Sequence, residues 1–417
     1  MKNFLFISSL LLSLFGTGQK NSNQQYKEDF NYFWTTIRDN YCYWDKKQTD
    51  WQMVKATLEP VVDTVTTRAS FIAVLEKAFY EIYDHHASLN TNTAVSERLV
   101  PSGTDLWAEF INGKPMITEV RFGSGADKAG IQGGMELAAC NDVSIEKALQ
   151  PFLPNCLSMP DTEARNYALR LLLAGDHSTE RKITLKIGGR LKDFYPDKPV
   201  NYLELKQKKP EIEFRVLKGN IGYILINNSL GDDDLIPLFD SALTALNNTP
   251  ALILDMRNTP SGGNTTVARA IMGRFITHEG FYQKHELTSE EKESGIKRSW
   301  VEIVSPRKAT YTKPLVILVD HWTGSVGEGI VIGFDALRPT MIVGTRMAGL
   351  NGAVYSFTMP NTGIGFSFPA EKLFHINGLP RENFHPDKEI DLSKNNTGKD
   401  VILEEGLKYI SALPSQK

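Results

Sequence analysis

The sequence is poor in cysteine and has no excess of basic residues. Three cysteines in 417 residues are too few for a disulfide-rich scaffold or a zinc ribbon. Lys and Arg number 46 against 49 Asp and Glu, so the chain lacks the positive charge that holds a nucleic-acid backbone. With 41% hydrophobic and 10% aromatic residues it is neither disordered nor collagen-like. At about 150 residues per domain, the length predicts two or three globular domains, with no nucleic acid as partner.

Long hydrophobic runs are also absent, with one short exception at the N-terminus. Lys2 precedes an apolar run, Phe4–Phe15, and the small residues Gly16-Thr17-Gly18 follow it. This order is typical of a secretory signal peptide, and the run is shorter than the roughly 20 residues that span a bilayer. An uncleaved anchor is the alternative. Since no later segment reaches about 18 apolar residues, we expect a periplasmic or secreted protein that is not stably inserted in a membrane once residues 1–18 are removed.

Export would permit disulfides, but the three cysteines are an odd set. Cys140 and Cys156 are the conceivable pair. Cys140 ends an apolar run, Leu137–Cys140, so a buried free thiol is favoured there. No cysteine has the surroundings of a catalytic nucleophile.

Apolar periodicity divides the rest of the chain into three parts. Residues 19–98 predict a helical N-terminal domain, and residues 104–195 predict a small β domain of alternating strands and glycine turns. A proline- and lysine-rich linker, Pro196–Pro210, separates these from residues 211–417, which predict an α/β core. In that core we expect strands over 221–226, 251–256, 315–319 and 341–344, and helices over 235–246 and 326–337.

One strand-to-helix turn of this core, TGSVGE at Thr323–Glu328, has a candidate nucleophile. Ser325 would stand between a buried strand and a helix, where its hydroxyl rises above the sheet edge and the helix amides point to the same place. Such a serine can attack a carbonyl while the Val326 amide faces the oxyanion. The alternative is a serine that only caps the helix.

A second turn, Arg257–Gly263, follows another buried strand. Its adjacent Gly262 and Gly263 allow a ligand to approach the backbone and can present amide groups to it. Taken alone, this is also an ordinary connection between a strand and a helix.

Together these segments resemble the C-terminal processing (tail-specific) serine peptidases. The resemblance rests on LILDMRNTPSGGN, TGSVGE and MIVGT in the core, on GKPMITEVRFGSGADKAGIQGGMELAACNDVSI in the middle, and on INGLPRENFHPDKEI near the C-terminus. It covers about residues 25–395. It implies an α/β catalytic core of the ClpP/crotonase-like kind, a helical N-terminal part and an inserted PDZ-like β domain, with no metal and no cofactor.

The resemblance also bears on the general base. One branch of the family uses a Ser–Lys dyad, but Leu350 stands at the lysine's place and cannot accept a proton. A second branch, which includes tricorn peptidase, uses a histidine in a "DgH" motif and a glutamate in a late "E…PD" motif. His86, in Asp84-His85-His86, matches that histidine, and Glu382 matches that glutamate. His321 and His375 are the rival bases, and an exposed histidine pair or a surface glutamate are the alternatives.

The resemblance therefore implies an exported serine endopeptidase that hydrolyses peptides or unfolded proteins. Ser325 would be the nucleophile, His86 the base and Glu382 its orienting carboxylate, with the Val326 amide and a Gly262 or Gly263 amide as oxyanion hole. An ordinary histidine base predicts an activity limb with an apparent pKa of about 6–7. The alternative from another class is a non-catalytic peptide- or small-ligand-binding protein on the same fold.

The PDZ-like region would bind an extended peptide by strand addition and hold its carboxylate in backbone amides. The stretch that matches the carboxylate loop, Asp105–Phe110, has no glycine, and Glu109 would repel a carboxylate. A module that only packs on the core and shapes the cleft is therefore an equal alternative.

The N-terminal pattern gives the first testable prediction. We expect the exported protein to begin near Gln19, because the apolar run and the small residues after it form a cleavable signal. Intact-mass analysis of the protein recovered from the exported fraction measures this start. Retention of residues 1–18 would contradict the prediction.

Overall fold

The computed structural model describes residues 22–198, 209–227, 230–260, 262–307, 309–394 and 398–414. The expected signal segment, residues 1–18, lies outside these ranges, so its removal stays a prediction. Among the described residues, no helix combines the length and the apolar character needed to span a bilayer.

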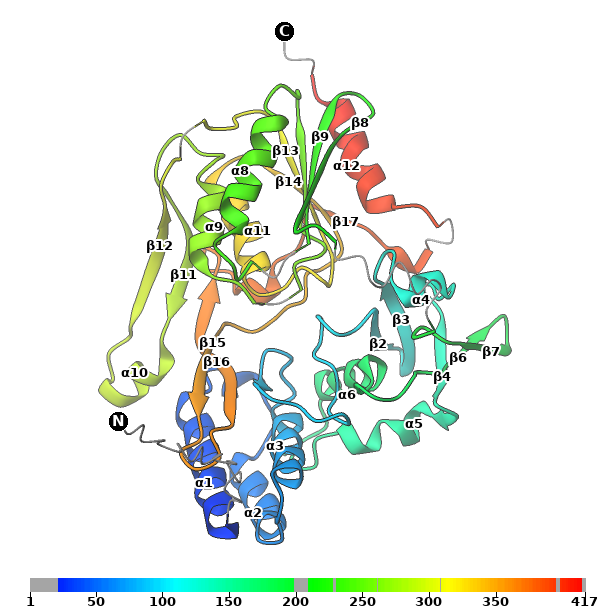
Figure 1. Cartoon of the computed structure of the whole chain (residues 1–417), viewed down its shortest axis with the longest axis vertical. Helices are drawn as coiled ribbons and strands as arrows, with labels where there is room; N and C mark the ends of the chain where they lie inside the picture. The colour runs from blue at the N-terminus through cyan, green and yellow to red at the C-terminus, as the bar shows by residue number, and fades with distance from the viewer. Residues whose placement is uncertain are drawn as a thin grey trace, which may run out of the picture.

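The N-terminal part is helical, as predicted. Its elements are α1 (Asn23–Asn40), η1 (Trp44–Lys46), α2 (Trp51–Val62) and α3 (Arg68–Ile82). The three α-helices begin at side chains that accept hydrogen bonds from the amides of the first turn: Ser22, Asp50 and Thr67. These helices lie at the lower end of Figure 1, next to the hairpin β15–β16.

The middle part, which we call the insert (residues 104–195), is built on an antiparallel sheet. The strands follow the order β2-β3-β4-β6-β7, with β5 paired to β4. Its elements are β2 (Leu106–Ile111), β3 (Lys114–Val120), α4 (Gly125–Lys128), β4 (Glu136–Cys140), β5 (Val143–Ser144), α5 (Ile145–Ala148), η2 (Gln150–Phe152), α6 (Thr162–Ala174), β6 (Ile183–Ile187) and β7 (Arg190–Phe194). Helix α6 packs along β2, and the insert has its own buried core.

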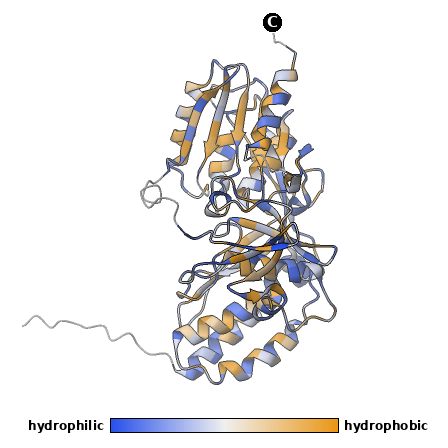
Figure 2. Ribbon diagram, turned by 90° about the vertical axis from the view of Figure 1, so that its right-hand side faces the viewer, coloured by the Kyte–Doolittle hydropathy of each residue, from blue (hydrophilic) through white to orange (hydrophobic). Residues whose placement is uncertain are grey.

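The core contains a central sheet in the order β17-β14-β13-β10-β9-β8, parallel except for the pair β8–β9. Its elements are β8 (Ile212–Leu217), β9 (Ile221–Ile226), α8 (Leu235–Ala245), β10 (Leu252–Asp255), α9 (Thr265–Met272), β13 (Leu315–Val319), α11 (Val326–Leu337), β14 (Met341–Gly344), η3 (Arg381–Asn383), β17 (Lys388–Glu389), η4 (Leu392–Lys394) and α12 (Val401–Ala412). The inner strands are buried on both faces, as parallel strands covered by helices require, and Figure 2 colours them as largely hydrophobic.

A third, antiparallel sheet ties the N-terminal helices to the core. It runs β1-β16-β11-β12, with β15 paired to β16. Its elements are β1 (Ser88–Leu89), β11 (Gly280–Glu286), α10 (Thr288–Ser294), β12 (Ser299–Val304), β15 (Ala353–Thr358) and β16 (Gly365–Phe374). Phe366 and Phe368 of β16 are buried in the same cluster as the apolar faces of α1, α2 and α3, so these helices pack against the β15–β16 hairpin.

The sequence predicts the central strands and helices well, and the mixed α/β architecture with N-terminal helices is confirmed. The third sheet was not predicted. Its outer strand β12 exposes Trp300, Val301 and Ile303, and its residues do not show a clear alternation of apolar and polar types. All three cysteines are buried free thiols, so the conceivable Cys140–Cys156 pair is not formed.

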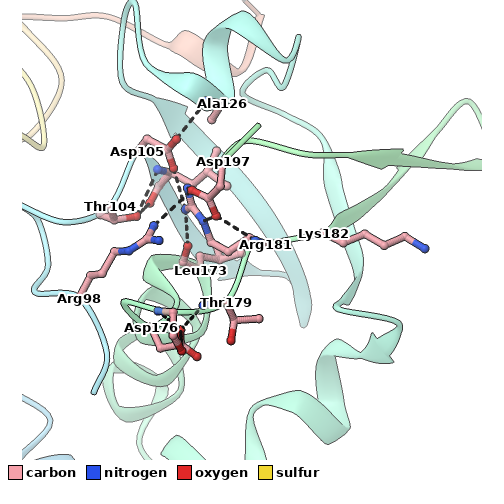
Figure 3. Close-up of polar contacts among 12 residues, drawn as sticks. Arg98, Thr104, Asp105, Ala126, Leu173, Asp176, Thr179, Arg181, Lys182 and Asp197 are labelled. Atoms are coloured by element: carbon pink, nitrogen blue, oxygen red, sulfur yellow. Dashed lines mark hydrogen bonds and ion pairs between the residues drawn. The ribbon is translucent and has the colours of Figure 1, made fainter. Parts of the chain in front are cut away.

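The buried Arg181 connects the segment where the chain begins the insert to the segment where it leaves the insert (Figure 3). The guanidinium of Arg181 donates to Asp197 through Nε and Nη2, at 2.8 and 2.7 Å, and to Asp105 through Nη1, at 2.8 Å. Asp105 also accepts the Ala126 amide, and Arg98 adds a bond to Asp197. Burial alone would raise the pKa of Asp197, but the bonds and charge of Arg181 lower it overall.

We predict that Arg181→Met lowers the free energy of unfolding by about 3 kcal/mol near pH 7, the lower end of the cost of breaking a buried ion pair. It leaves the half-buried Asp105 without its cation and leaves Asp197 with Arg98 alone. The lowered pKa of Asp197 means that its contribution is present above its unfolded pKa and is lost as the pH falls through the folded one. The difference from wild type should therefore shrink in acid. Urea unfolding at pH 7 and at about pH 2.5, below the ordinary aspartate pKa of about 3.9, measures it, with the exposed Arg190→Met as control; equal losses in both variants would contradict the prediction.

Candidate active site

Ser325 lies at the turn from β13 into α11, where the sequence places it. Its backbone has φ 55° and ψ −115°, a conformation that residues other than glycine rarely adopt. Gly324 precedes it because a Cβ there would come within 2.6 Å of the carbonyl oxygen of Pro260. This sharp turn holds Ser325 at the N-terminus of α11, with 9% of the residue's surface exposed.

His86 lies opposite Ser325, although 239 positions separate the two in sequence. Its Nε2 is 3.1 Å from Ser325 Oγ, so the hydroxyl faces the imidazole. Its Nδ1 is 2.6 Å from the carbonyl oxygen of Asn351. Because a carbonyl only accepts hydrogen bonds, the proton of the neutral ring sits on Nδ1 and leaves Nε2 free to accept the serine proton.

The carboxylate of Asp84 forms hydrogen bonds with both His86 and Asn351. One carboxylate oxygen accepts the His86 backbone amide at 2.9 Å. The other accepts the side-chain amide of Asn351 at 2.9 Å and the hydroxyl of Tyr41 at 2.7 Å. Neither Asn351 nor Tyr41 was predicted from the sequence to take part in the site. The available signals were Asp84, two positions before His86, and the place of Asn351 directly after Leu350.

Glu382 does not contact the imidazole, contrary to the role expected of it. Its carboxylate forms an ion pair with Lys46, and the Nδ1 atom that it was expected to bind is occupied by the carbonyl of Asn351. The physical reason is the turn η3, which directs Glu382 toward η1. The neighbouring Arg381 instead donates to the carbonyls of Leu350 and Gly352, at 3.0 and 2.8 Å, and so holds the loop that carries Asn351.

The rival histidines are engaged elsewhere. Nδ1 of His321 contacts the carboxylate of Glu119, and Nε2 of His375 is 3.2 Å from Asp335. In the part of the chain that the structure describes, no three His, Cys, Asp or Glu side chains are grouped as ligands for a metal ion.

Glu328, the last residue of the TGSVGE turn, is a fully buried carboxyl that fixes the backbone of the candidate nucleophile, Ser325. It accepts the Ser325 amide at 2.8 Å and the Gly349 amide at 3.0 Å, and so joins the turn to the loop before Asn351. Burial raises the pKa of Glu328 to about 7, and the charge of Arg381 opposes that rise. Because Glu328 takes the Ser325 amide, that amide is not available to a substrate.

Val326 is the first residue of α11, and its backbone amide donates no hydrogen bond to the described part of the chain. The expected second donors, Gly262 and Gly263, are exposed on the adjacent turn, with φ values of 69° and 122°. That turn is tied to the nucleophile by the bond from the Gly324 amide to the Thr259 carbonyl, at 3.0 Å. No hydrogen bond joins either glycine to Ser325 within the described residues.

Leu350 forms an apolar wall beside the nucleophile turn. It is 4% exposed, and its Cδ1 would lie 3.2 Å from a Cβ on Gly324. Together with Glu328 and Asn351 it borders a cavity of about 350 Å³, which is also lined by residues of the insert, of the N-terminal part and of the core around Arg346 and Arg381. The lysine position of the Ser–Lys branch is thus filled by a packed hydrophobic side chain.

Burial lowers the pKa of His86 to about 4, and the nearby charge of Arg381 adds to that effect. The Asn351 carbonyl and Asp84 favour the protonated ring and oppose the shift. The imidazole is therefore neutral at neutral pH, which is the form that accepts a proton from a serine.

Two family models match the sequence. Residues 220–390 match peptidase family S41, and residues 22–79 match the C1 domain of tricorn protease. The first range includes Ser325, Asn351 and Glu382, and the second ends shortly before His86. No curated protein matches the chain.

Solved structures share the fold. Mature CPAF is 14% identical, with a TM-score of 0.60 over 93% of this chain and 96% of its own. A putative peptidase from Parabacteroides merdae is 16% identical, with a TM-score of 0.56 over 94% and 100%. The photosystem II D1 C-terminal processing protease is also 16% identical, with a TM-score of 0.54 over 88% and 93%. At these identities the likeness extends to the fold alone.

The site predicts an unusual pH profile. Since the neutral form of His86 is reactive and its pKa is lowered to about 4, reactivity should persist as the pH falls and decline only near pH 4. The second-order rate of labelling by a fluorophosphonate, measured from pH 3.5 to 8, tests this. A limb at about 6–7, the value of an exposed histidine, or at 7–8, typical of a desolvated lysine, would contradict it.

Proposed function

We propose that this chain, a serine peptidase whose residues 220–390 match peptidase family S41, is an exported endopeptidase of the Ser–His type that cleaves peptides or unfolded proteins. The observation that supports the mechanism best is the 3.1 Å approach of Ser325 Oγ to His86 Nε2, with Nδ1 of the same ring bonded to the Asn351 carbonyl. The periplasmic or secreted location rests on the N-terminal sequence pattern.

In the proposed acylation step, His86 Nε2 accepts the hydroxyl proton as Ser325 Oγ attacks the scissile carbonyl. The C–N bond then breaks, and His86 returns that proton to the leaving amine. Water, activated by the same imidazole, hydrolyses the acyl-enzyme and restores the serine. The Val326 amide faces the oxyanion, and a Gly262 or Gly263 amide is the proposed second donor.

The charge that develops on His86 is stabilised in two stages. The Asn351 carbonyl accepts a hydrogen bond from Nδ1–H directly. The buried carboxylate of Asp84 does not contact the ring; it accepts a hydrogen bond from the side-chain amide of Asn351. This differs from a triad in which a carboxylate contacts the imidazole. Glu382 is proposed to act at a distance, by neutralising Lys46 at the edge of the cavity.

The proposed function is tested by covalent labelling. A fluorophosphonate should modify wild type and leave Ser325→Ala unmodified, because Oγ is the reacting atom. His86→Ala should lower the labelling rate by about 10²–10⁴-fold or more, since it removes the base. His85→Ala should keep a measurable rate, because His85 is not the base.

Two outcomes would overturn the proposal. Wild type that is folded but not labelled would favour the alternative, a non-catalytic binding protein on this fold. A several-fold gain of activity on adding Leu350→Lys to His86→Ala would instead identify a decayed Ser–Lys enzyme.

A further inference from the structure

The insert contacts both loops that carry the proposed catalytic pair. The base loop (residues 83–87) follows α3 and contains His86. The nucleophile loop (residues 320–325) follows β13 and ends at Ser325. These loops belong to different parts of the chain, so contacts with other segments set their relative position. One such segment is the loop around Gly349 and Asn351, which bonds Glu328 and Asp84, and the insert is a second.

On the side of the base loop, the ring of Tyr167 in α6 stacks on His85, with centroids 4.5 Å apart and planes 28° apart. Tyr83, at the start of the base loop, also contacts the insert, because its hydroxyl donates to Asp161 at 2.8 Å. His85 is the direct neighbour of His86 in sequence. A shift of α6 is therefore transmitted to the base through one peptide unit.

On the side of the nucleophile loop, Trp107 in β2 stacks on His321, with centroids 4.4 Å apart and planes 21° apart. The next residue, Trp322, donates its indole N–H to the Thr104 carbonyl at 2.8 Å. Glu119 of β3 contacts Nδ1 of His321. The insert thus holds the nucleophile loop by one stacked pair of rings and two polar contacts.

These contacts form a hydrophobic cluster distinct from the core of the insert. Tyr83 from the base loop and Trp322 from the nucleophile loop are buried in it beside Trp107 and Tyr167, which are 2% and 5% exposed. The rings of His85 and Trp107 lie 6.4 Å apart and connect the two stacks. One face of the insert, between β2 and α6, therefore serves both loops at once.

This same face is not open for strand addition. Strand β2 is the outer strand of its sheet, but its Phe110 amide already donates to the Asn166 side chain of α6, at 2.9 Å. Arg170 of α6 bonds Glu109 of β2 at 2.8 Å and lies over the Trp107 ring. Side chains of α6 thus occupy the edge that an added peptide strand would need.

We propose that the insert is a positioning clamp, in which Trp107 and Tyr167 stack on His321 and His85 to set the distance between Ser325 and His86. The proposal rests on the proposed function, and it assigns the β2–α6 face to the catalytic loops instead of to a peptide. Displacements of about 1 Å in a catalytic pair cost on the order of 10²-fold in rate. Trp107 and Tyr167 are therefore positioning residues for the reaction.

The test removes each ring and asks whether the Ser325–His86 pair fails in the way that misplacement predicts. Tyr167→Leu and Trp107→Leu should lower the rate of fluorophosphonate labelling by about 10–10²-fold. They should also move its acid limb upward from about 4, because a loosened base loop lets water reach His86. Tyr167→Phe, which keeps the stacked ring, should restore most of the rate and the wild-type limb.

Matched controls separate this effect from general damage. Phe122→Leu removes an exposed ring from the same insert and should leave rate and limb unchanged. If Tyr167→Leu does not fold, His85→Leu removes the same stack from the other side at a half-buried position and carries the same expectation. Folded leucine variants that label at the wild-type rate with the wild-type limb would overturn the clamp, whereas absence of labelling in wild type would overturn the proposed function itself.

Discussion

The hydrogen bond from Nδ1 of His86 to the carbonyl of Asn351 is the interaction on which the rest of the site depends. It places the ring proton on Nδ1 and turns Nε2 toward Ser325. A neutral carbonyl orients a ring without the strong charge stabilisation that a carboxylate gives to an imidazolium. The burial of His86 further disfavours the imidazolium, so the ground state is a neutral imidazole, with Asp84 as a compensating charge nearby.

The site is assembled from loops that are distant in sequence, and buried charged groups fasten them to one another. Glu328 joins the nucleophile turn to the loop around Gly349, and Arg381 holds the carbonyls on either side of Asn351. Asp84 joins that loop to His86. Buried groups of this kind are costly when unpaired, so removing one of them is expected to disturb the whole arrangement.

Local sequence signals were enough for the turn at Ser325 and most strands of the central sheet, because each depends on a short pattern of apolar residues, glycines and caps. The loop at His86 was identified through the resemblance to the histidine branch of the family. Asn351 was missed because it acts through its backbone carbonyl, which any residue has. Glu382 was misplaced because a motif does not state which way a short 3-10 turn points its side chain. The hairpin of Phe366 and Phe368 was missed because its burial comes from helices that lie more than 280 positions earlier.

The central claim, that His86 is a buried neutral base aimed at Ser325, is tested most directly by ¹⁵N NMR of the imidazole nitrogens during a pH titration, with His86→Gln used to assign the signals. The account predicts an Nδ1–H tautomer at neutral pH, with Nε2 unprotonated, and protonation only as the pH approaches about 4. An Nε2–H tautomer, or a titration near the ordinary value of about 6.5, would contradict it.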